Sequence, residues 1–259
     1  MIQKISIFIT IVILSFNICF AQQNQQRRKT DMLELPAYSN KFSHQVIYHF
    51  AYTTSYNKKH KIPNWVAWKL SGENVMNNLY ERDKYFYPDP NVLNCPDGSS
   101  YEYSKYQYAR GHMCPAGDNK WSKDAIFQCN YMTNICPQQP KLNNGSWKKL
   151  EERCRTWAKL YKEIYIVCGP IIPKRVTKRI GSLGITVPQQ FFKAIMRIDK
   201  KGNYYMIGYL FSQDDKRKIL SIDEIERIAE VDLFHNIPDH IETKVEAMVD
   251  TSNWLHYDR

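Results

Sequence analysis

The sequence predicts an α+β fold in which a central antiparallel sheet is flanked by helices. Strand-like segments recur along the chain, and they do not alternate regularly with helices as they would in a doubly wound parallel fold. One long amphipathic helix is expected near the middle of the chain. With 259 residues, of which 43% are hydrophobic and 24% charged, the chain can form a substantial core in one domain.

Seven segments have the composition or the alternation of strands. They are 44–53, 64–70, 103–110, 130–137, 163–168, 189–198 and 204–211. Between the second and the third of them, residues 87–99 are rich in proline and glycine, which is typical of turns. No internal repeat, low-complexity tract or linker in the sequence indicates a division of the sheet between two domains.

The clearest helix is expected over 143–162, where apolar side chains recur at intervals of three and four residues and form one stripe. The stripe consists of Trp147, Leu150, Cys154, Trp157 and Tyr161. A second helix is expected to begin at Ser221, because Ser221 and Glu224 have the spacing of a capping box. Its buried face would contain Ile222, Ile225 and Ile228.

The N-terminus has the features of a secretory signal peptide at residues 1–21. Lys4 precedes an apolar run over 5–20, and Cys19 and Ala21 form a small-x-small cleavage site. The alternative is an uncleaved membrane anchor, which is disfavoured because the run falls short of about 20 uninterrupted apolar residues. The sequence therefore predicts a secreted or periplasmic protein without stable membrane association after the signal is cleaved.

The rest of the chain is predicted to form a flexible lead-in at 22–40 and a single domain at 41–259. The formal net charge of the whole chain is +10, and removal of Lys4 with the signal leaves +10 − 1 = +9. Such a charge favours polyanionic partners, through steering and through the release of counterions from phosphates. The alternative is an ordinary soluble surface charge, which by itself binds no nucleic acid.

The cysteines of an exported protein are expected to form disulfides. Cys19 would leave with the signal, and six cysteines would remain, which allows 15 connectivities. These six are Cys95, Cys114, Cys129, Cys136, Cys154 and Cys168. A zinc site is disfavoured because the sequence has no C-x-x-C pair, and a nucleophilic Cys114, two residues from His112, is a further alternative.

Residues with reactive chemistry concentrate in two stretches, 109–118 and 133–152. Arg110 and His112 lie at the end of a predicted strand and share one of its faces, because side chains alternate along a strand. Further along the chain, Asn143 and Asn144 open the long helix, and Glu151 lies about two turns into it. A guanidinium, an imidazole, an amide oxygen and a carboxylate could thus converge on one strand–strand–helix unit.

Phosphodiester hydrolysis needs such a set of groups. A base must take a proton from water, and histidine does this near neutral pH. A hard cation and an arginine can neutralise the charge that grows on the phosphorane and on the leaving oxygen. Mg²⁺ prefers oxygen ligands and keeps most of its waters, so that one neutral amide oxygen from the protein can hold it.

Each of these residues also has a purely structural explanation. A histidine after glycine is often a turn or packing residue. Asn143 and Asn144 before a glycine could form a turn or a helix N-cap. Glu151 could pair with Arg155 four residues later on the helix surface, and residues 148–152 could be a solvated helix face.

Together, however, the residues resemble the signature of the DNA/RNA non-specific endonuclease family, the ββα-metal nucleases of the endonuclease G type. That signature comprises Asp-Arg-Gly-His, Pro-Ala, Asn-Ile-x-Pro-Gln, Leu-Asn-x-Gly-x-Trp and Leu-Glu, in this order. The corresponding residues here are Arg110-Gly111-His112, Pro115-Ala116, Asn134-Ile135-Cys136-Pro137-Gln138, Leu142-Asn143-Asn144-Gly145-Ser146-Trp147 and Leu150-Glu151. The resemblance extends from an early strand at 64–67 to a late helix at 223–226.

The resemblance implies a central antiparallel sheet with helices on both sides and a metal-dependent DNA and RNA hydrolase. His112 corresponds to the general base of the family. Asn143 corresponds to the single direct Mg²⁺ ligand, where other cations such as Mn²⁺ could also bind. Glu151 corresponds to the carboxylate that holds metal-bound water. The expected reaction is an in-line attack by water that releases a 3′-oxygen and leaves a 5′-phosphate.

The resemblance also assigns supporting residues. Arg110 and Asn134 correspond to residues that support the phosphate and the local geometry of the active site. Arg155, one turn past Glu151, is similar to an arginine that acts at the scissile phosphate. Arg82 corresponds to an upstream phosphate-binding arginine, although the intervening segment differs in length. DNA and RNA are the expected partners, contacted through their phosphates, and the sequence leaves open a homodimer.

One position departs from the family signature, because Ala109 stands where the family has aspartate. Two other classes of function therefore remain open. The first is a catalytically impaired protein that binds nucleic acid on a nuclease scaffold, and it would leave plasmid intact in the presence of Mg²⁺. The second is a disulfide-stabilised envelope protein whose basic charge meets anionic surface polymers, and it would not prefer nucleic acid to other polyanions.

Overall fold

The computed structural model describes residues 32–38, 44–101 and 107–254. The chain divides into two units, Met1–Leu33 and Glu34–Arg259, and all of the elements below belong to the second unit. The predicted signal peptide and most of the predicted lead-in lie outside the described residues, as does part of the strand expected at 103–110. Within the described part of the chain, no helix is both long enough and apolar enough to cross a membrane.

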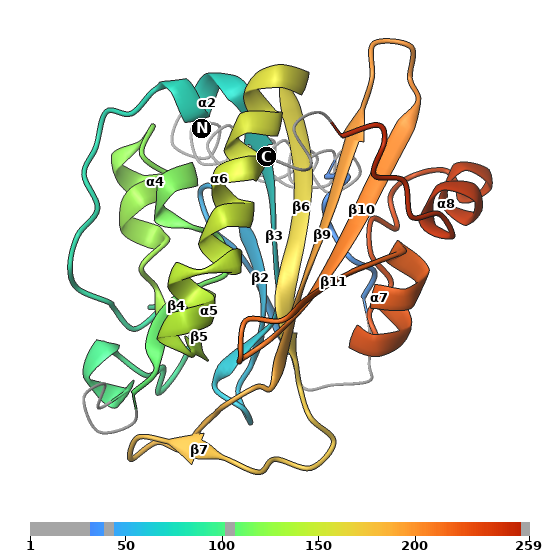
Figure 1. Ribbon diagram of the computed structural model, residues 1–259. Coiled ribbons are helices and arrows are strands. Elements are labelled where there is room, and N and C mark those ends of the chain that lie inside the picture. Colours follow the sequence, from blue (N-terminus) through green and yellow to red (C-terminus); the bar gives the residue numbers. More distant parts are fainter. Residues whose placement is uncertain (1–31, 39–43, 102–106, 255–259) are drawn as a thin grey trace, which may run out of the picture. The chain divides into compact units, whose positions relative to one another are not determined.

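A seven-stranded sheet forms the centre of the second unit, and every neighbouring pair of its strands is antiparallel (Figure 1). In spatial order the strands are β1 (Gln45–Tyr48), β2 (Thr53–Asn57), β3 (Ile62–Ser71), β6 (Glu163–Ile171), β9 (Gln190–Ile198), β10 (Tyr204–Ser212) and β11 (Arg217–Leu220). This arrangement confirms the predicted antiparallel α+β fold. The sheet contains most of the strands that the hydrophobic pattern predicts.

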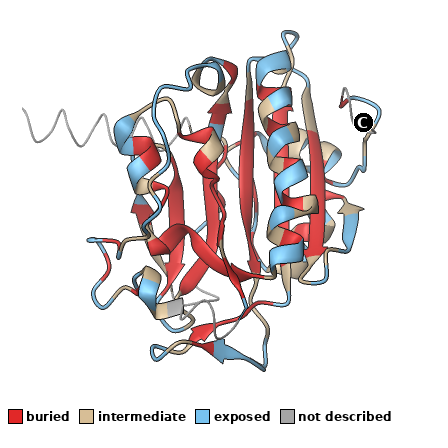
Figure 2. Cartoon of the chain, turned by 60° about the vertical axis from the view of Figure 1, so that its left-hand side comes forward, coloured by how far each residue is buried: buried red, intermediate tan, exposed pale blue. Residues whose placement is uncertain are grey.

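Helices cover both faces of this sheet (Figure 1). On one side lie α2 (Gly72–Met76), α4 (Lys123–Gln128), α5 (Pro140–Asn144) and α6 (Ser146–Tyr161), and on the other lie α7 (Ile222–Ala229) and α8 (Asp239–Glu246). Because both faces are covered, β3, β6, β9 and β10 are buried along most of their length (Figure 2). Helix α6 packs against β3 and β6, whereas α7 packs against β9 and β10.

The helix predicted over 143–162 is in fact two helices, α5 and α6, which meet at Gly145. The backbone of Gly145 has φ −96° and ψ −122°, which is not helical, and a Cβ there would lie 2.3 Å from the Lys141 carbonyl oxygen. Asp215 accepts a hydrogen bond from the Ser146 amide at 3.0 Å, which supports the start of the second helix. The break gives Asn143 an orientation that an uninterrupted helix would not.

The predicted strand–strand–helix unit is present. Strands β4 (Ala109–His112) and β5 (Ile135–Gln138) pair antiparallel, with His112 opposite Ile135, and α5 and α6 follow β5. The strand expected at 130–137 begins late, because η3 (Met132–Asn134) occupies its first half. From α6, Trp147, Leu150, Cys154 and Trp157 enter the core as the helical spacing predicts.

The helix predicted from Ser221 is α7, and its capping box is formed. The Ser221 hydroxyl accepts a hydrogen bond from the Glu224 amide at 3.2 Å, and the Ser221 amide donates to the Glu224 carboxylate at 3.0 Å. Ile222 and Ile225 are buried against the sheet, and Ile228 is half-buried. The strand predicted over 44–53 is wrong in extent, because β1 ends at Tyr48 and the chain turns back before β2 begins at Thr53. Several short elements lack local signals and were not predicted: α2, α4, α8, β2, β11 and the β7 (Arg179–Ile180) and β8 (Ile185–Thr186) pair.

The prediction of disulfides is wrong for the described chain. All six cysteines beyond the N-terminal segment are free thiols, and five of them are buried. They fill small apolar positions of the core, where a thiol packs like a short aliphatic side chain. Cys114 is fully buried and its pKa is raised well above the usual value, mainly by burial, so the alternative of a nucleophilic thiolate is also wrong.

Candidate active site

A cleft of about 450 Å³ opens beside the strand–strand–helix unit. It brings together residues that are distant in the sequence: Arg82, Phe86, Ala109, Arg110, His112, Pro115, Ala116, Gly117, Asn143, Asn144, Lys148, Glu151 and Arg155. All of the predicted site residues except Asn134 therefore line one cavity. A base, oxygen donors and several guanidinium groups surround a space that is open to solvent.

His112 is the last residue of β4, and its imidazole is buried at the floor of the cleft. Its Nε2 lies 2.9 Å from the Asn130 amide oxygen, and the Asn130 amide nitrogen donates to the Asp83 carbonyl at 3.2 Å. Because this second bond fixes the amide nitrogen of Asn130 as a donor, its oxygen must accept from His112. The hydrogen-bond pattern therefore assigns the proton to Nε2 and leaves Nδ1 as a proton acceptor.

The electrostatic surroundings of His112 keep the imidazole neutral. Burial lowers its pKa, and the positive charge of Arg82 lowers it further, to about 4, against a smaller raising effect of the hydrogen bond to Asn130. At neutral pH the imidazole is thus in the form that can accept a proton. The indole of Trp147 donates to the His112 carbonyl at 3.3 Å, which joins the end of β4 to α6.

Glu151 lines the cleft from α6, and burial raises its pKa to about 7. The positive charge of Lys193 lowers this pKa and is the largest effect that opposes burial. The Asp118 carboxylate raises the pKa further, and Arg155 lowers it. Lys193 is fully buried, and its Nζ lies 4.2 Å from the centre of the Trp147 ring without a hydrogen-bond partner among the described residues. This buried cation favours the ionised form of Glu151.

Asn143 lies in the last turn of α5 and is half-buried at the edge of the cleft. Its amide nitrogen donates a hydrogen bond to the Asn144 side-chain oxygen at 3.3 Å. The side-chain oxygen of Asn143 is therefore the atom that can bind a cation. With the carboxylate of Glu151 in the same cleft, the donor set consists of hard oxygens. These residues fit Mg²⁺ or Mn²⁺, which prefer oxygen ligands, better than a metal that prefers sulfur.

Three arginines give the cleft its positive charge. Arg155 donates to Asp118 at 2.9 Å, and the carboxylate it pairs with is only 1% exposed. The guanidinium carbons of Arg82 and Arg110 lie 5.4 Å and 5.3 Å from the centre of the Phe86 ring. Aromatic contacts and the buried pair thus hold three guanidinium groups at the cleft, and such a set is suited to recognition of a polyanion.

Asn134 does not line the cleft, although it was predicted among the catalytic residues. Its side chain is fully buried and makes three hydrogen bonds of 2.8 Å: its amide nitrogen donates to the Cys114 and Cys129 carbonyls, and its oxygen accepts from the Cys114 amide. It therefore fixes the backbone two residues after His112. This position allows support of local geometry and does not allow contact with a phosphate.

The position of the missing family aspartate is buried. Ala109 pairs with Gln138 across the β4–β5 ladder, and the nitrogen and the oxygen of the Gln138 side-chain amide both lack a hydrogen-bond partner among the described residues. A Cβ on Gly111 would lie 2.1 Å from this amide oxygen, so only glycine leaves room for it. A buried amide without partners costs free energy, and an acceptor at position 109 could supply one.

Sequence reasoning missed four residues that shape the site. Phe86 and Asn130 carried no local signal, because their roles depend on contacts across the fold. Lys148 lines the cleft although its helix face was considered solvated. Lys193 did carry a signal, since it interrupts the apolar run of strand β9 between Phe192 and Ala194, and a lysine in a buried strand is uncommon unless it has a role.

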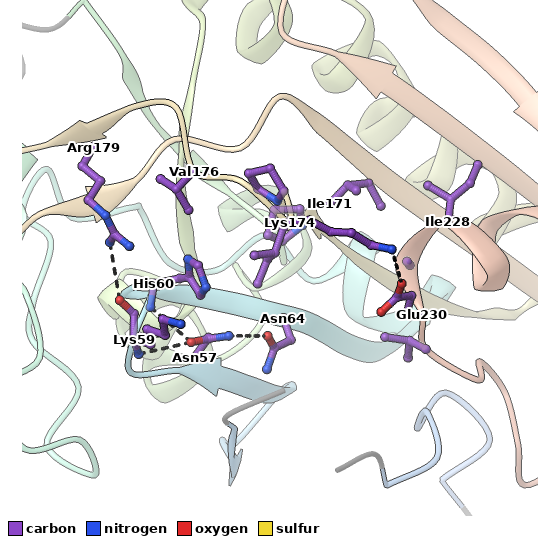
Figure 3. A pocket seen from close by; sticks show the side chains of 15 residues that line it. Asn57, Lys59, His60, Asn64, Ile171, Lys174, Val176, Arg179, Ile228 and Glu230 are labelled. Carbon is purple, nitrogen blue, oxygen red and sulfur yellow. Dashed lines mark hydrogen bonds and ion pairs between the residues drawn. The ribbon is translucent and has the colours of Figure 1, made fainter. Parts of the chain in front are cut away.

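A second cavity, of about 630 Å³, lies among the β2–β3 turn, the end of β6 and the end of α7 (Figure 3). It is basic, but its polar side chains are engaged in holding the chain. The Asn57 oxygen accepts from the Lys59 and His60 amides at 3.1 Å, and Lys174 lies 3.7 Å from Glu230. Its histidine, His60, is engaged as well, with Nδ1 3.0 Å from the Thr186 hydroxyl. The motif residues His112, Asn143 and Glu151 meet in the other cleft, which is therefore the candidate active site.

Comparison with known proteins agrees with the geometry. The family described as DNA/RNA non-specific endonuclease matches residues 32–240. The chain is 33% identical over 151 residues to "Nuclease EXOG, mitochondrial" of Danio rerio, which covers 55% of this chain and 44% of that protein. It is 32% identical over 223 residues to "Nuclease" of Nostoc sp.. That alignment covers 77% of this chain and 76% of the Nostoc protein. The matched region thus spans less than half of the fish protein.

The fold also has a solved counterpart. A crystal structure of the EndoG/EndoGI complex superposes with a TM-score of 0.69 at 24% identity, over 80% of this chain and 90% of that chain. At this level of identity the likeness concerns the fold, and it supports the antiparallel α+β architecture with its ββα unit.

The prediction of a secreted or periplasmic location is contradicted by these comparisons. Relatives from Danio rerio, Homo sapiens and Saccharomyces cerevisiae are named mitochondrial nucleases. The prediction depended on an apolar run after one lysine, a pattern read from charge and length alone, and those residues lie outside the described chain. The expectation of disulfides was derived from the same inference, and the free thiols remove it as well.

Proposed function

The chain belongs to the DNA/RNA non-specific endonuclease family, and from this premise we propose that it hydrolyses phosphodiester bonds of DNA and RNA in the cleft around His112. The main support is the neutral imidazole of His112, held by Asn130 in the tautomer of a base, in the same cavity as Asn143, Glu151 and the arginines. We assign the activity to the unit Glu34–Arg259, close to the predicted domain at 41–259.

In the proposed reaction, Nδ1 of His112 accepts a proton from a water molecule that attacks phosphorus in line with the leaving oxygen. The bond to the 3′-oxygen breaks, so the new fragment carries a 5′-phosphate. The proton on His112 then passes to solvent, and the leaving 3′-oxygen takes up a proton from solvent to become a hydroxyl. Because the pKa of His112 is low, the protonated imidazole loses its proton quickly. The same low pKa makes the neutral imidazole a weaker base.

Asn143 would hold Mg²⁺ directly, and Glu151 would hold its water ligands. When bound, Mg²⁺ supplies positive charge to the phosphorane and to the leaving oxygen. Arg82, Arg110 and Arg155 would bind the flanking and scissile phosphates. Such contacts reach no base edge, which explains cleavage without sequence preference, and they weaken as salt rises.

The proposal is tested by digestion of supercoiled plasmid and of RNA with Mg²⁺ and with excess chelator. Cleavage of both substrates that stops in chelator is expected. Product ends are identified by labelling with and without prior phosphatase, since a 5′-phosphate blocks labelling until it is removed. Equal cleavage in chelator would contradict the proposed metal requirement. Product ends that carry a 3′-phosphate would show that the 3′-oxygen is not the leaving group.

We expect cleavage to require more Mg²⁺ as the pH falls below about 7. Burial holds the pKa of Glu151 near 7, so below that pH a proton competes with the cation for this carboxylate. The concentration of Mg²⁺ that gives half-maximal cleavage should then rise up to about tenfold per pH unit. Plasmid cleavage is measured against Mg²⁺ concentration at several pH values, with Glu151→Gln as the control that should lose this dependence. A requirement that does not change with pH would contradict the role of Glu151.

A second candidate function rests on Ala109, which replaces the family aspartate: a catalytically impaired protein that binds nucleic acid. The buried side-chain amide of Gln138 beside Ala109 has no hydrogen-bond partner among the described residues, which leaves a polar group uncompensated next to β4. We expect Ala109→Asp to raise kcat/KM by about tenfold, because an acceptor for Gln138 is a charge-assisted hydrogen bond worth about 1.5–3 kcal/mol.

Ala109→Asn is the matched control for Ala109→Asp, because it adds the same volume without the charge. A parent protein that binds DNA but cuts nothing, together with an Ala109→Asp variant that cuts, would establish the impaired scaffold. If Ala109→Asp has the activity of the parent or less, Ala109 is not a defect and the second candidate fails.

A further inference from the structure

Helices α7 and α8 lie on the side of the sheet opposite to α5 and α6 (Figure 1). Three carboxylates from these two helices form one cluster. Asp223 and Glu226 lie three residues apart on α7, so they share one face of that helix. Glu246 is the last residue of α8. One carboxylate oxygen from each of the three lies within 4.8 Å of the others. None of these residues belongs to the cleft around His112.

The cluster contains a buried carboxylate oxygen without a partner. Glu246 is only 4% exposed, and its Oε1 has no hydrogen-bond partner among the described residues. Glu226 is partly buried and accepts a hydrogen bond from the Leu233 amide at 2.6 Å with one of its oxygens. Asp223 is exposed and leaves the cluster accessible to solvent. A buried carboxylate needs a counter-charge or a proton, because its desolvation is costly.

The surrounding charges increase this need. Burial raises the pKa of Glu246 to about 9, and the carboxylates of Glu226, Glu242, Asp223 and Asp232 all raise it further. The pKa of Glu226 is raised to about 7, again mainly by burial. Carboxylates gathered in this way either share protons or bind a cation. Several observations thus point to the same unmet requirement for positive charge.

We propose that Asp223, Glu226 and Glu246 form a second divalent-cation site, suited to Ca²⁺, that ties α7 to α8. Oxygens bound to one Ca²⁺ lie about 2.3–2.6 Å from the ion, so any two of them are at most about 5 Å apart. The three oxygens satisfy this limit as they stand. The exposed side of the cluster leaves room for the waters that complete a coordination number of about 6–8.

Ca²⁺ suits the cluster better than Mg²⁺. The three carboxylates come from two separate helices, and Ca²⁺ accepts ligands in an irregular arrangement, whereas Mg²⁺ demands a near-ideal octahedron. The site is expected to act on stability and not on chemistry, because α7 and α8 contact β9 and β10 on the face that does not contain the cleft. A cation there would hold the C-terminal helices together.

The test is thermal unfolding of the full chain in chelator and in millimolar Ca²⁺. Ca²⁺ that binds only the folded chain should raise Tm by about 5 °C at a concentration well above Kd. Asp223→Asn and Glu246→Gln should lose most of this shift. Asp223→Asn changes an exposed side chain, so it keeps the test open even if a change at the buried Glu246 weakens folding. Asp239→Asn is the matched control, because it removes an acidic charge from α8 outside the cluster and should keep the shift.

Equilibrium dialysis gives a second readout that does not depend on stability. The variant Asn143→Ala, which lacks the proposed catalytic ligand, should still bind one Ca²⁺ per chain. The double variant Asn143→Ala with Asp223→Asn should bind none. Cleavage by Asp223→Asn in Mg²⁺ should equal that of the parent, so failure of this proposal is distinguishable from failure of the proposed nuclease. The proposal is overturned if Ca²⁺ gives no shift, or the same shift in all variants. If Glu246→Gln raises Tm in chelator and Ca²⁺ has no effect, a shared proton occupies the cluster instead.

Discussion

Replacement of His112 by alanine is expected to lower kcat for phosphodiester cleavage by about 10²–10⁴-fold, with little change in nucleic-acid binding. The imidazole is neutral at pH 7, since burial and the charge of Arg82 lower its pKa to about 4, and its Nδ1 is left to accept a proton. Its removal takes the base away and leaves the metal ligand and the arginines in place. Single-turnover cleavage of a labelled duplex at saturating enzyme measures the chemical step directly.

His60→Ala is the matched control for this experiment. His60 is a half-buried histidine in the second cavity (Figure 3), where its Nδ1 lies 3.0 Å from the Thr186 hydroxyl. It should retain the parent rate if His112 is the base. Binding of a duplex in Ca²⁺, measured for the parent and both variants, separates loss of chemistry from loss of affinity. Cleavage by His112→Ala at more than a tenth of the parent rate would mean that another group takes the proton.

The sequence predicts the larger elements because their signals are local. The apolar stripe of α6 and the mainly apolar runs of β3, β9 and β10 each predict an element without reference to the rest of the chain. Short elements are different. Helix α8 begins after Pro238 without a side-chain cap, and β7 and β8 have two residues each, so their formation depends on tertiary contacts that a pattern cannot contain.

The candidate site shows the same division. His112, Asn143 and Glu151 were found because ordered motifs resemble those of a known family, and the fold brings them to one cavity. Asn130 could not be found, because its role is to accept a hydrogen bond from an imidazole that lies 18 residues earlier. The break at Gly145 was also missed, since the pattern of apolar residues continues through it while Asp215, from the turn after β10, supports the second helix.

The errors about location and cysteines have one physical cause. An apolar segment is recognised by its length and flanking charge, and six cysteines then seem to require pairing in an oxidising compartment. The core shows why the inference fails: five of the thiols are free and buried, and burial raises their pKa values. The number of cysteines here therefore reflects their use as small buried side chains and did not predict disulfides.

Replacement of Asn143 by alanine is the second change with a large expected effect, a loss of about 10²–10³-fold in cleavage at millimolar Mg²⁺. Asn143 offers its amide oxygen from the last turn of α5, and its nitrogen is engaged with Asn144. Without this oxygen, Glu151 would have to hold the cation alone. The loss should therefore shrink as the Mg²⁺ concentration rises, which a loss of the base would not do. Cleavage measured over a wide range of Mg²⁺ concentrations distinguishes the two.

Asn144→Ala is the matched control, because Asn144 is the exposed neighbour on the same turn and lines the same cleft. If Asn143 is the ligand, Asn144→Ala should need only slightly more Mg²⁺, since it removes the hydrogen bond that orients Asn143 and not the ligand itself. Equal losses in the two variants would instead indicate that the end of α5 has unfolded, which far-ultraviolet circular dichroism and Tm would reveal. The variant Asn143→Asp gives a second result that distinguishes a metal ligand. Its charged oxygen should bind Mn²⁺ and Mg²⁺ at lower concentration, but it should neutralise part of the positive charge that stabilises the phosphorane. The affinity for the metal should therefore rise while kcat falls.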